Sequence, residues 1–155
     1  MNEQRKSLLR LLFLGVASIQ AIIGLLVSLY FSEFAQYNPC ELCWYQRICL
    51  YPLAIILPIA FLSNDKRTFL RYASPLVGIG MAIAGYHTVI YYMAQYRTLH
   101  PGSFITTCAL SGPNSCTTPY ITWFGFISIP LLSLVAFIII AGCLIGYRRL
   151  LSSED

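Results

Sequence analysis

Four long uncharged segments, separated by short polar stretches, organise the chain. Lys, Arg, Asp and Glu are absent from residues 11–32, 48–64, 72–96 and 120–147. The second of these segments reaches the length of a membrane span if it begins near Leu42. A span needs about 20 apolar residues, within a range of roughly 17–25. Because only a helix of this length satisfies its own backbone hydrogen bonds in lipid, each segment is predicted to be a transmembrane helix.

These segments predict an all-α membrane protein that forms a four-transmembrane-helix bundle. We expect the helices at about residues 8–32, 42–63, 72–96 and 120–147. The connecting stretches are too short for a separate soluble domain, so residues 1–155 are predicted to form a single integral membrane domain. The first segment is longer than the apolar core of a cleaved signal peptide, which favours a permanent helix.

Composition supports lipid as the main solvent of this chain. Hydrophobic residues make up 57% of the sequence and charged residues only 10%, whereas a soluble domain has about 25% charged residues. The net charge is +4, but the basic residues lie in short segments between apolar runs instead of on one polar face. This distribution argues against nucleic-acid binding and instead predicts how the helices are oriented.

The basic residues lie mostly on one side of the predicted bundle. Eight of the ten occur before the first helix, between the second and third, or after the fourth: Arg5, Lys6, Arg10, Lys66, Arg67, Arg71, Arg148 and Arg149. The other side has only Arg47 and Arg97. The positive-inside rule therefore predicts that both termini are cytoplasmic and that the loops 33–41 and 97–119 lie outside.

Six cysteines occupy two kinds of position in this topology. Two lie in apolar helices, where we expect inert packing residues, and four lie on the outer side, where disulfides persist. The apolar positions are Cys49 and Cys143, and the outer positions are Cys40, Cys43, Cys108 and Cys116. Both outer pairs are candidate disulfides, although their connectivity stays open from sequence alone.

The Cys40-x-x-Cys43 pair, at the start of the second helix, fits redox chemistry better than a structural role. As a disulfide it would close a very small ring and would constrain the unfolded chain little. A four-thiolate zinc site with Cys108 and Cys116 is an alternative, although their spacing differs from that of a typical zinc site. Haem attachment would need His after the second cysteine, and Trp44 stands there. At a helix start, unpaired N–H groups favour a reactive thiolate.

Arg47 places a permanent charge close to this pair. It follows Cys43 by four residues, so both lie on one helix face, with Arg47 about one turn deeper. A charge that enters an apolar run is costly and suggests a functional role. The alternative is an arginine that reaches up to the lipid headgroups. Next to a redox thiol, the guanidinium is expected to stabilise a thiolate or an anionic electron acceptor dissolved in the lipid.

Together these motifs resemble the DsbB family of membrane disulfide oxidoreductases. The resemblance covers about residues 8–147 and rests on CELCWYQR at the outer end of the second helix, the paired loop cysteines, and WFGFISIP at the start of the fourth helix. The short loops are similar to those of BdbC-type members. Two alternatives remain: a vitamin K epoxide reductase-like oxidoreductase, whose Cys-x-x-Cys lies on the last helix of its bundle, and a non-catalytic scaffold with structural disulfides.

The resemblance implies an electron path for these cysteines. In a bacterial cell membrane, a reduced extracytoplasmic thioredoxin-like thiol oxidase would attack the Cys108–Cys116 disulfide, after docking on the stretch 100–107. Cys40 and Cys43 would then reoxidise that pair. Cys43, the cysteine nearest Arg47, would pass two electrons to a membrane quinone, either menaquinone or ubiquinone. The loop between Cys108 and Cys116 is shorter than in proteobacterial members of the family.

The third helix supplies two further candidates for the quinone site. Counted from an outer end near residue 96, His87 should lie deeper than Arg47. Tyr91 is therefore expected to meet a quinone headgroup beside Arg47 more readily than His87. His87 is predicted to be either a quinone contact or a hydrogen-bonded packing residue. Small residues on the same helix, Gly78, Ala82 and Gly85, are expected to allow close helix packing.

Overall fold

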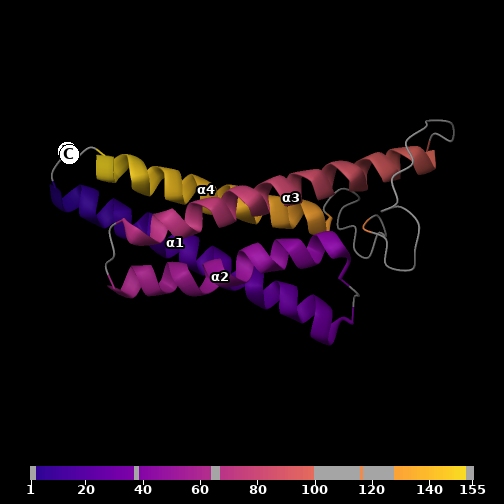
Figure 1. The fold of residues 1–155 in the computed structure, drawn as a ribbon, viewed down its shortest axis with the longest axis horizontal. Coiled ribbons are helices and arrows are strands. Elements are labelled where there is room, and N and C mark those ends of the chain that lie inside the picture. Colours follow the sequence, from indigo (N-terminus) through magenta and orange to yellow (C-terminus); the bar gives the residue numbers. More distant parts are fainter. Residues whose placement is uncertain (1–2, 37–38, 64–66, 100–115, 117–127, 153–155) are drawn as a thin grey trace.

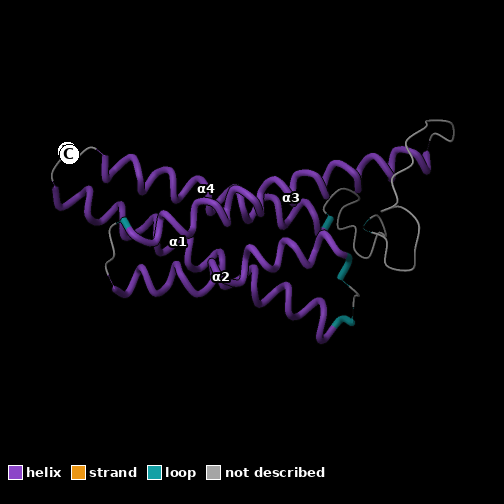
Figure 2. The backbone as a smooth tube through the Cα atoms, viewed as in Figure 1, coloured by secondary structure: helices purple, strands orange, loops and turns teal. Residues whose placement is uncertain are grey.

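The computed structural model describes residues 3–36, 39–63, 67–99, 116 and 128–152. Within these ranges the chain is helical almost throughout and has no strand (Figure 2). The helices are α1 (Glu3–Leu29), α2 (Glu41–Ser63), α3 (Thr68–Leu99) and α4 (Ile129–Ser152), with a π-helical turn η1 (Tyr30–Phe34) that continues α1. Four helices are long and apolar enough to cross a membrane, so the predicted all-α fold class is confirmed.

Several helix limits on α1, α3 and α4 differ from those expected, and α1 begins at Glu3 instead of near residue 8. α3 begins at Thr68 and ends at Leu99, because a helix continues past its apolar segment as long as its backbone bonds persist. α4 begins at Ile129, nine residues after the expected start, and ends at Ser152. Pro130 lies in its first turn, the part of a helix where a missing N–H costs nothing, and Ser128 before it is not helical.

The four helices form a closed ring in which each packs against two neighbours. α1 contacts α2 and α4, and α3 completes the ring between α2 and α4 (Figure 1). The beginning of α1, the end of α2, the beginning of α3 and the end of α4 lie toward the left end in Figure 1. The start of α2 lies at the opposite end, so the motif at residues 40–47 is far from both termini.

The interior of the bundle is formed by one face of each helix. On α2 this face carries buried residues at helical spacing: Leu50, Leu53, Leu57 and Ala60. Phe137 and Ile140 on α4 are fully buried against them. Cys49 and Cys143 belong to the same apolar core, in agreement with their expected role as packing residues.

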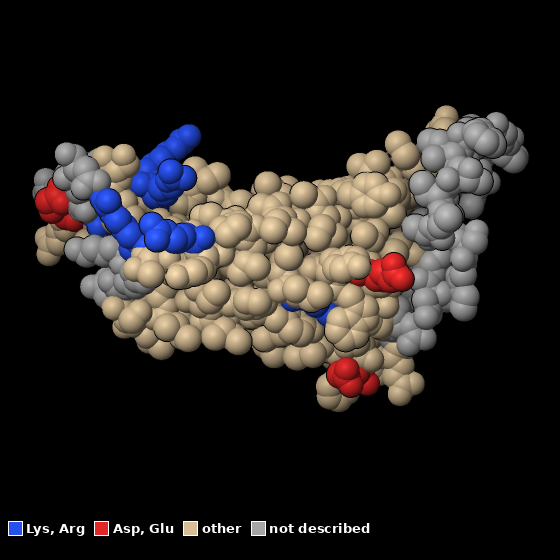
Figure 3. Space-filling view, in the orientation of Figure 1, with Lys and Arg blue, Asp and Glu red and all other residues tan. Residues whose placement is uncertain are grey.

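The exterior of the bundle is apolar along its middle and basic at one end. Large apolar side chains are exposed on every helix, and Leu62 on α2 is 82% exposed. A water-soluble protein rarely exposes apolar surface on this scale, so this surface suits lipid tails. On the face shown in Figure 3, most Lys and Arg side chains gather at the end where α1 begins and α4 ends.

Close helix packing involves a different glycine from those expected. A Cβ added at Gly78 or Gly85 would have no atom within 4 Å, and Ala82 is exposed. Gly80 instead lies directly beneath the ring of Phe137, so a Cβ there would overlap the ring. The small-residue pattern on α3 thus predicted a close contact but placed it on the wrong face.

We expect Gly80→Ala to destabilise the bundle by about 1–3 kcal/mol, the usual cost of overpacking a full interior. Phe137 has no room to move because its side chain is completely buried. Gly78→Ala is the matched control, since the same change on the same helix meets open space. Thermal unfolding followed by circular dichroism in detergent should show a lower Tm for Gly80→Ala only. Equal Tm values for the two variants would show that the Phe137 ring can shift to make room for the added methyl group.

Candidate active site

One face of the first turns of α2 carries the polar residues of the site. Cys40 precedes the helix, and its carbonyl accepts the backbone N–H of Trp44 at 3.1 Å. Cys43, Gln46 and Arg47 follow at intervals of three and four residues, so all three point toward the bundle interior. Glu41 lies in the first turn, where a carboxylate complements the helix dipole.

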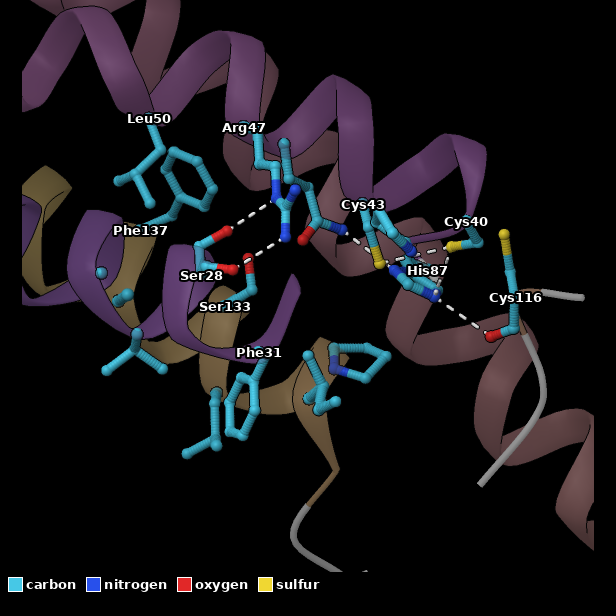
Figure 4. Close-up of a pocket in the computed structure, with 18 of the residues that line it drawn as sticks. Ser28, Phe31, Cys40, Cys43, Arg47, Leu50, His87, Cys116, Ser133 and Phe137 are labelled. Atoms are coloured by element: carbon cyan, nitrogen blue, oxygen red, sulfur yellow. Dashed lines mark hydrogen bonds between the residues drawn. The ribbon is translucent and has the colours of Figure 1, made fainter. Parts of the chain in front are cut away.

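These side chains open onto a cavity of about 310 Å³ at this end of the bundle. All four helices, η1 and Cys116 contribute to its lining (Figure 4). Six predicted site residues line it together: Cys40, Cys43, Arg47, His87, Tyr91 and Cys116. The seventh, Cys108, and the proposed docking stretch 100–107 lie outside the described residues.

Three cysteines form a chain of hydrogen bonds at the mouth of this cavity. The thiol of Cys40 donates to the sulfur of Cys43, with the two Sγ atoms 3.3 Å apart. Cys116 is hydrogen-bonded to Cys40 from the other side, through its own side chain. All three are thiols in this structure. The sulfurs of Cys40 and Cys43 would need to move only slightly closer to reach the S–S bond length of a disulfide. Cys40 therefore stands between the other two sulfurs.

Cys40 and Cys116, the two thiols that lie outside the helical spans, both have a raised pKa. The hydrogen bond that Cys40 donates to Cys43, and then burial, raise the pKa of Cys40 to about 12. Burial, followed by the hydrogen bond to Cys40, raises the pKa of Cys116 to about 12. In the dithiol state the Cys40 and Cys116 thiols therefore stay protonated at neutral pH and act as hydrogen-bond donors. The Cys43 sulfur accepts the hydrogen bond from Cys40.

Arg47 is turned across the bundle to α1 instead of up toward the lipid headgroups. Its Nε donates to Ser28 Oγ at 2.7 Å, and one Nη donates to the carbonyl of Ser28 at 2.8 Å. Its guanidinium also lies over the ring of Trp44, 5.6 Å from the centroid. Arg47 lines the cavity, and these bonds leave further N–H donors of the guanidinium for a ligand there.

His87 lies beside the thiols, which differs from the depth expected for it. Its Nε2 is 3.9 Å from Cys40 Sγ and 3.1 Å from the carbonyl oxygen of Cys116, and its Nδ1 is 3.1 Å from Gln46 Nε2. The count took residue 96 as level with the start of α2. α3 instead continues past the start of α2 to Leu99, so His87 lies closer to the level of the thiols than the count predicted. Tyr91, one turn further along α3, is buried in the same cavity wall and accepts a hydrogen bond from Gln95 at 3.4 Å.

Two partners in this network were not predicted from the sequence. Ser28 is one of several uncharged polar residues in a mostly apolar segment. Gln46 is an uncharged polar residue that could equally have faced the headgroups. Polar side chains within a span usually hydrogen-bond across helices, and that is the signal that would have identified both. The missing information was which helix faces each of them.

The same side chains meet the distance requirement of a metal site. Ligand atoms of Cys40, Cys43 and His87 all lie within 4.8 Å of one another. However, His87 Nε2 faces a carbonyl oxygen, which can only accept, so this nitrogen carries a hydrogen and has no lone pair to offer. The arrangement therefore supports thiol chemistry, in which adjacent sulfurs exchange bonds.

Comparisons with known proteins agree with this chemistry. The family model "Disulfide bond formation protein DsbB" matches residues 9–146. The chain belongs to the DsbB family. The predicted resemblance is thus confirmed, and this DsbB-family chain is a membrane disulfide oxidoreductase.

Relatives in this family cover nearly the full length of the chain. The chain is 46% identical to "Disulfide bond formation protein C" of Bacillus subtilis over 132 residues, which is 84% of this chain and 88% of the relative. It is 41% identical to "Probable disulfide formation protein C 1" of Bacillus anthracis over 143 residues, covering 92% and 94%. No solved structure matches the chain.

The hydrogen-bond chain predicts the order in which the thiols of the reduced protein react. Cys40 should be alkylated by iodoacetamide more slowly than Cys43, because it is buried and its raised pKa keeps it protonated at pH 8. The Cys40 rate should rise about tenfold per pH unit between pH 8 and pH 10, since its thiolate fraction is still far from saturation there. Peptide mass spectrometry of briefly labelled protein measures both rates. Faster labelling of Cys40 would contradict the observed direction of the bond.

Proposed function

We propose that this protein is a quinone-dependent thiol oxidase that reoxidises an extracytoplasmic thioredoxin-like protein. Electrons would pass from the Cys108/Cys116 pair to the Cys40/Cys43 pair and then to a membrane quinone. The observation that carries this proposal is the shared cavity, which has Cys43 and Arg47 in its wall and Cys116 beside Cys40. It gives one thiol pair access both to an apolar pocket and to a cysteine of the outer loop.

The cavity has the composition that a quinone needs. Apolar surface forms most of its wall, with Ile23 and Val27 from α1 and Leu132 and Phe137 from α4. One cation, Arg47, supplies the few directed polar contacts that ligand sites in apolar pockets typically have. A bound quinone supplies a two-electron acceptor next to Cys43.

Arg47 would act on the acceptor side of Cys43. Negative charge develops on the acceptor oxygens as electrons arrive, in a region of low dielectric where a fixed cation is worth more than in water. The two bonds to Ser28 hold the guanidinium in place before the reaction, so little reorganisation is needed. We assign Tyr91 and His87 to the α3 wall of the same site, with Tyr91 on the quinone side.

On the thiol side, the two cysteine pairs would communicate through Cys40. Attack of the partner's thiolate on Cys108 breaks the Cys108–Cys116 bond and releases the Cys116 thiolate. This thiolate attacks Cys40 of the Cys40–Cys43 disulfide, so that a Cys40–Cys116 bond forms and Cys43 leaves as a thiolate. Cys108, freed when the partner forms its own disulfide, attacks Cys116 and releases Cys40. The Cys40/Cys43 dithiol then carries the two electrons.

The proposed topology places this chemistry on the extracytoplasmic face of a bacterial cell membrane. Most Lys and Arg side chains gather at the end of the bundle opposite the cavity (Figures 1 and 3). The positive-inside rule makes that end cytoplasmic, together with both termini. The cysteines then lie in the compartment where protein disulfides are made.

Thiol trapping in membranes tests quinone dependence. With the quinone pool depleted, Cys40 and Cys43 should accumulate as alkylatable thiols, and adding quinone should return them to a disulfide. Cys43→Ser should abolish oxidation of an added reduced thioredoxin-like protein, whereas Cys49→Ala and Cys143→Ala should not, because they lie in the apolar core. If the fraction of Cys40 and Cys43 in disulfide form does not change with the quinone pool, the result would instead support a structural scaffold.

Arg47→Ala should raise the KM for quinone and lower kcat, by roughly 10- to 100-fold in kcat/KM, as expected for a lost hydrogen bond to a developing charge. Arg47→Lys should recover only part of this, since it keeps the charge but loses the planar fork. The assay is thiol oxidation by purified protein against the concentration of a short-chain quinone. Arg71→Ala, an exposed arginine near the start of α3, is the control. Wild-type kinetics for Arg47→Ala would place the quinone elsewhere.

A further inference from the structure

The contacts of His87 determine which of its ring nitrogens carries the hydrogen. Nε2 lies 3.1 Å from the carbonyl oxygen of Cys116, which has no hydrogen to give. Nε2 must therefore donate, and in the neutral ring Nδ1 is left as an acceptor. Gln46 Nε2 lies 3.1 Å from Nδ1 and donates to it. The two bonds thus select the same tautomer, and each supports the other.

This arrangement is shielded from solvent. His87 is 2% exposed and Gln46 7% exposed, so water cannot readily replace either bond. A buried donor that loses its partner pays the full cost of desolvation. The carbonyl of Cys116 is thus the acceptor that satisfies His87 Nε2, and the outer loop is tied at that point to α3 (Figure 4).

The bond acts on Cys116, the loop cysteine that bonds to Cys40 in the exchange. It holds the backbone of Cys116, while the side chain of Cys116 reaches Cys40. The same Nε2–H lies 3.9 Å from Cys40 Sγ, so it also faces the sulfur that must accept the new bond. His87 thus contacts both partners of the exchange between the two cysteine pairs.

We propose that His87 is a positioning residue for this exchange: its Nε2–H holds the Cys116 backbone so that the Cys116 sulfur meets Cys40, and Gln46 fixes the tautomer that makes this possible. This role rests on the proposed function, and it assigns His87 to the thiol side of the site instead of the quinone side. In the step concerned, the Cys116 thiolate bonds to Cys40 Sγ, the Cys40–Cys43 bond breaks, and Cys43 leaves with the electron pair.

The test isolates the Cys40–Cys116 bond. A chain with Cys43→Ser, Cys108→Ser, Cys49→Ala and Cys143→Ala keeps only those two cysteines. The purified full-length protein is equilibrated in detergent with mixtures of reduced and oxidised glutathione. The disulfide fraction, read by mass spectrometry after alkylation, gives the effective concentration of one thiol at the other.

We expect His87→Phe to lower this effective concentration about fivefold, as expected for one hydrogen bond of about 1 kcal/mol. Gln46→Leu should lower it in the same direction, because the ring is then free to take the other tautomer. His87→Gln should restore most of the loss, since its amide can donate from nearly the same place. Thr88→Val is the matched control on α3, because within the described part of the chain Thr88 bonds to its own helix, at the carbonyl of Ala84.

The outcomes separate this proposal from its alternatives. If His87→Phe and Gln46→Leu both keep the wild-type equilibrium, His87 does not position Cys116 and the proposal is overturned. A raised quinone KM in His87→Phe, with an unchanged Cys40–Cys116 equilibrium, would overturn it by assigning His87 to the quinone. Glutathione exchange involves no quinone, so failure of the quinone-trapping experiment would leave this result interpretable on its own.

Discussion

The hydrogen bonds that polar side chains must find inside a lipid-facing bundle are the constraint on which the rest of this site depends. In lipid no water is available to replace a missing partner, and an unsatisfied polar group costs several kcal/mol. Arg47 satisfies this constraint through Ser28 on α1, and His87 through Gln46 on α2 and the backbone of Cys116. Each pair joins two segments that are distant in the sequence, so the bonds that satisfy the side chains also assemble the site.

The position of Cys40 and Cys43 divides the site into two halves. Cys43 and Arg47 lie in the part of the cavity wall to which we assign the electron acceptor. Cys40 lines the same cavity and lies next to Cys116 and His87. The two-residue spacing at a helix start places the first sulfur before the helix and the second within it. In the function that we propose, this spacing lets the pair exchange bonds with Cys116 at one end and pass electrons to the acceptor at the other.

Packing keeps this arrangement in place. In the wall of the cavity, Phe137 of α4 lies directly over Gly80 of α3, and Leu50 of α2 packs against Gly24 of α1. Such close contacts set the distances between helices, and those distances determine whether Arg47 reaches Ser28 and whether Gln46 reaches His87. The bundle interior is therefore part of the site's geometry, even though none of these four packing residues takes part in the chemistry.

The sequence by itself determined the number of helices, their approximate limits, the Cys-x-x-Cys position and the association of Arg47 with Cys43. These features follow from local rules: apolar length gives a span, and a spacing of four residues puts two side chains on one helix face. Only the tertiary structure decided that Ser28 and Gln46 complete the site and that Cys116 lies beside Cys40. It also decided that Gly80 rather than Gly78 makes the close contact, and that His87 lies level with the thiols. These depend on the rotation and axial offset of one helix against another, which many side chains set together and which no local pattern along a single segment encodes.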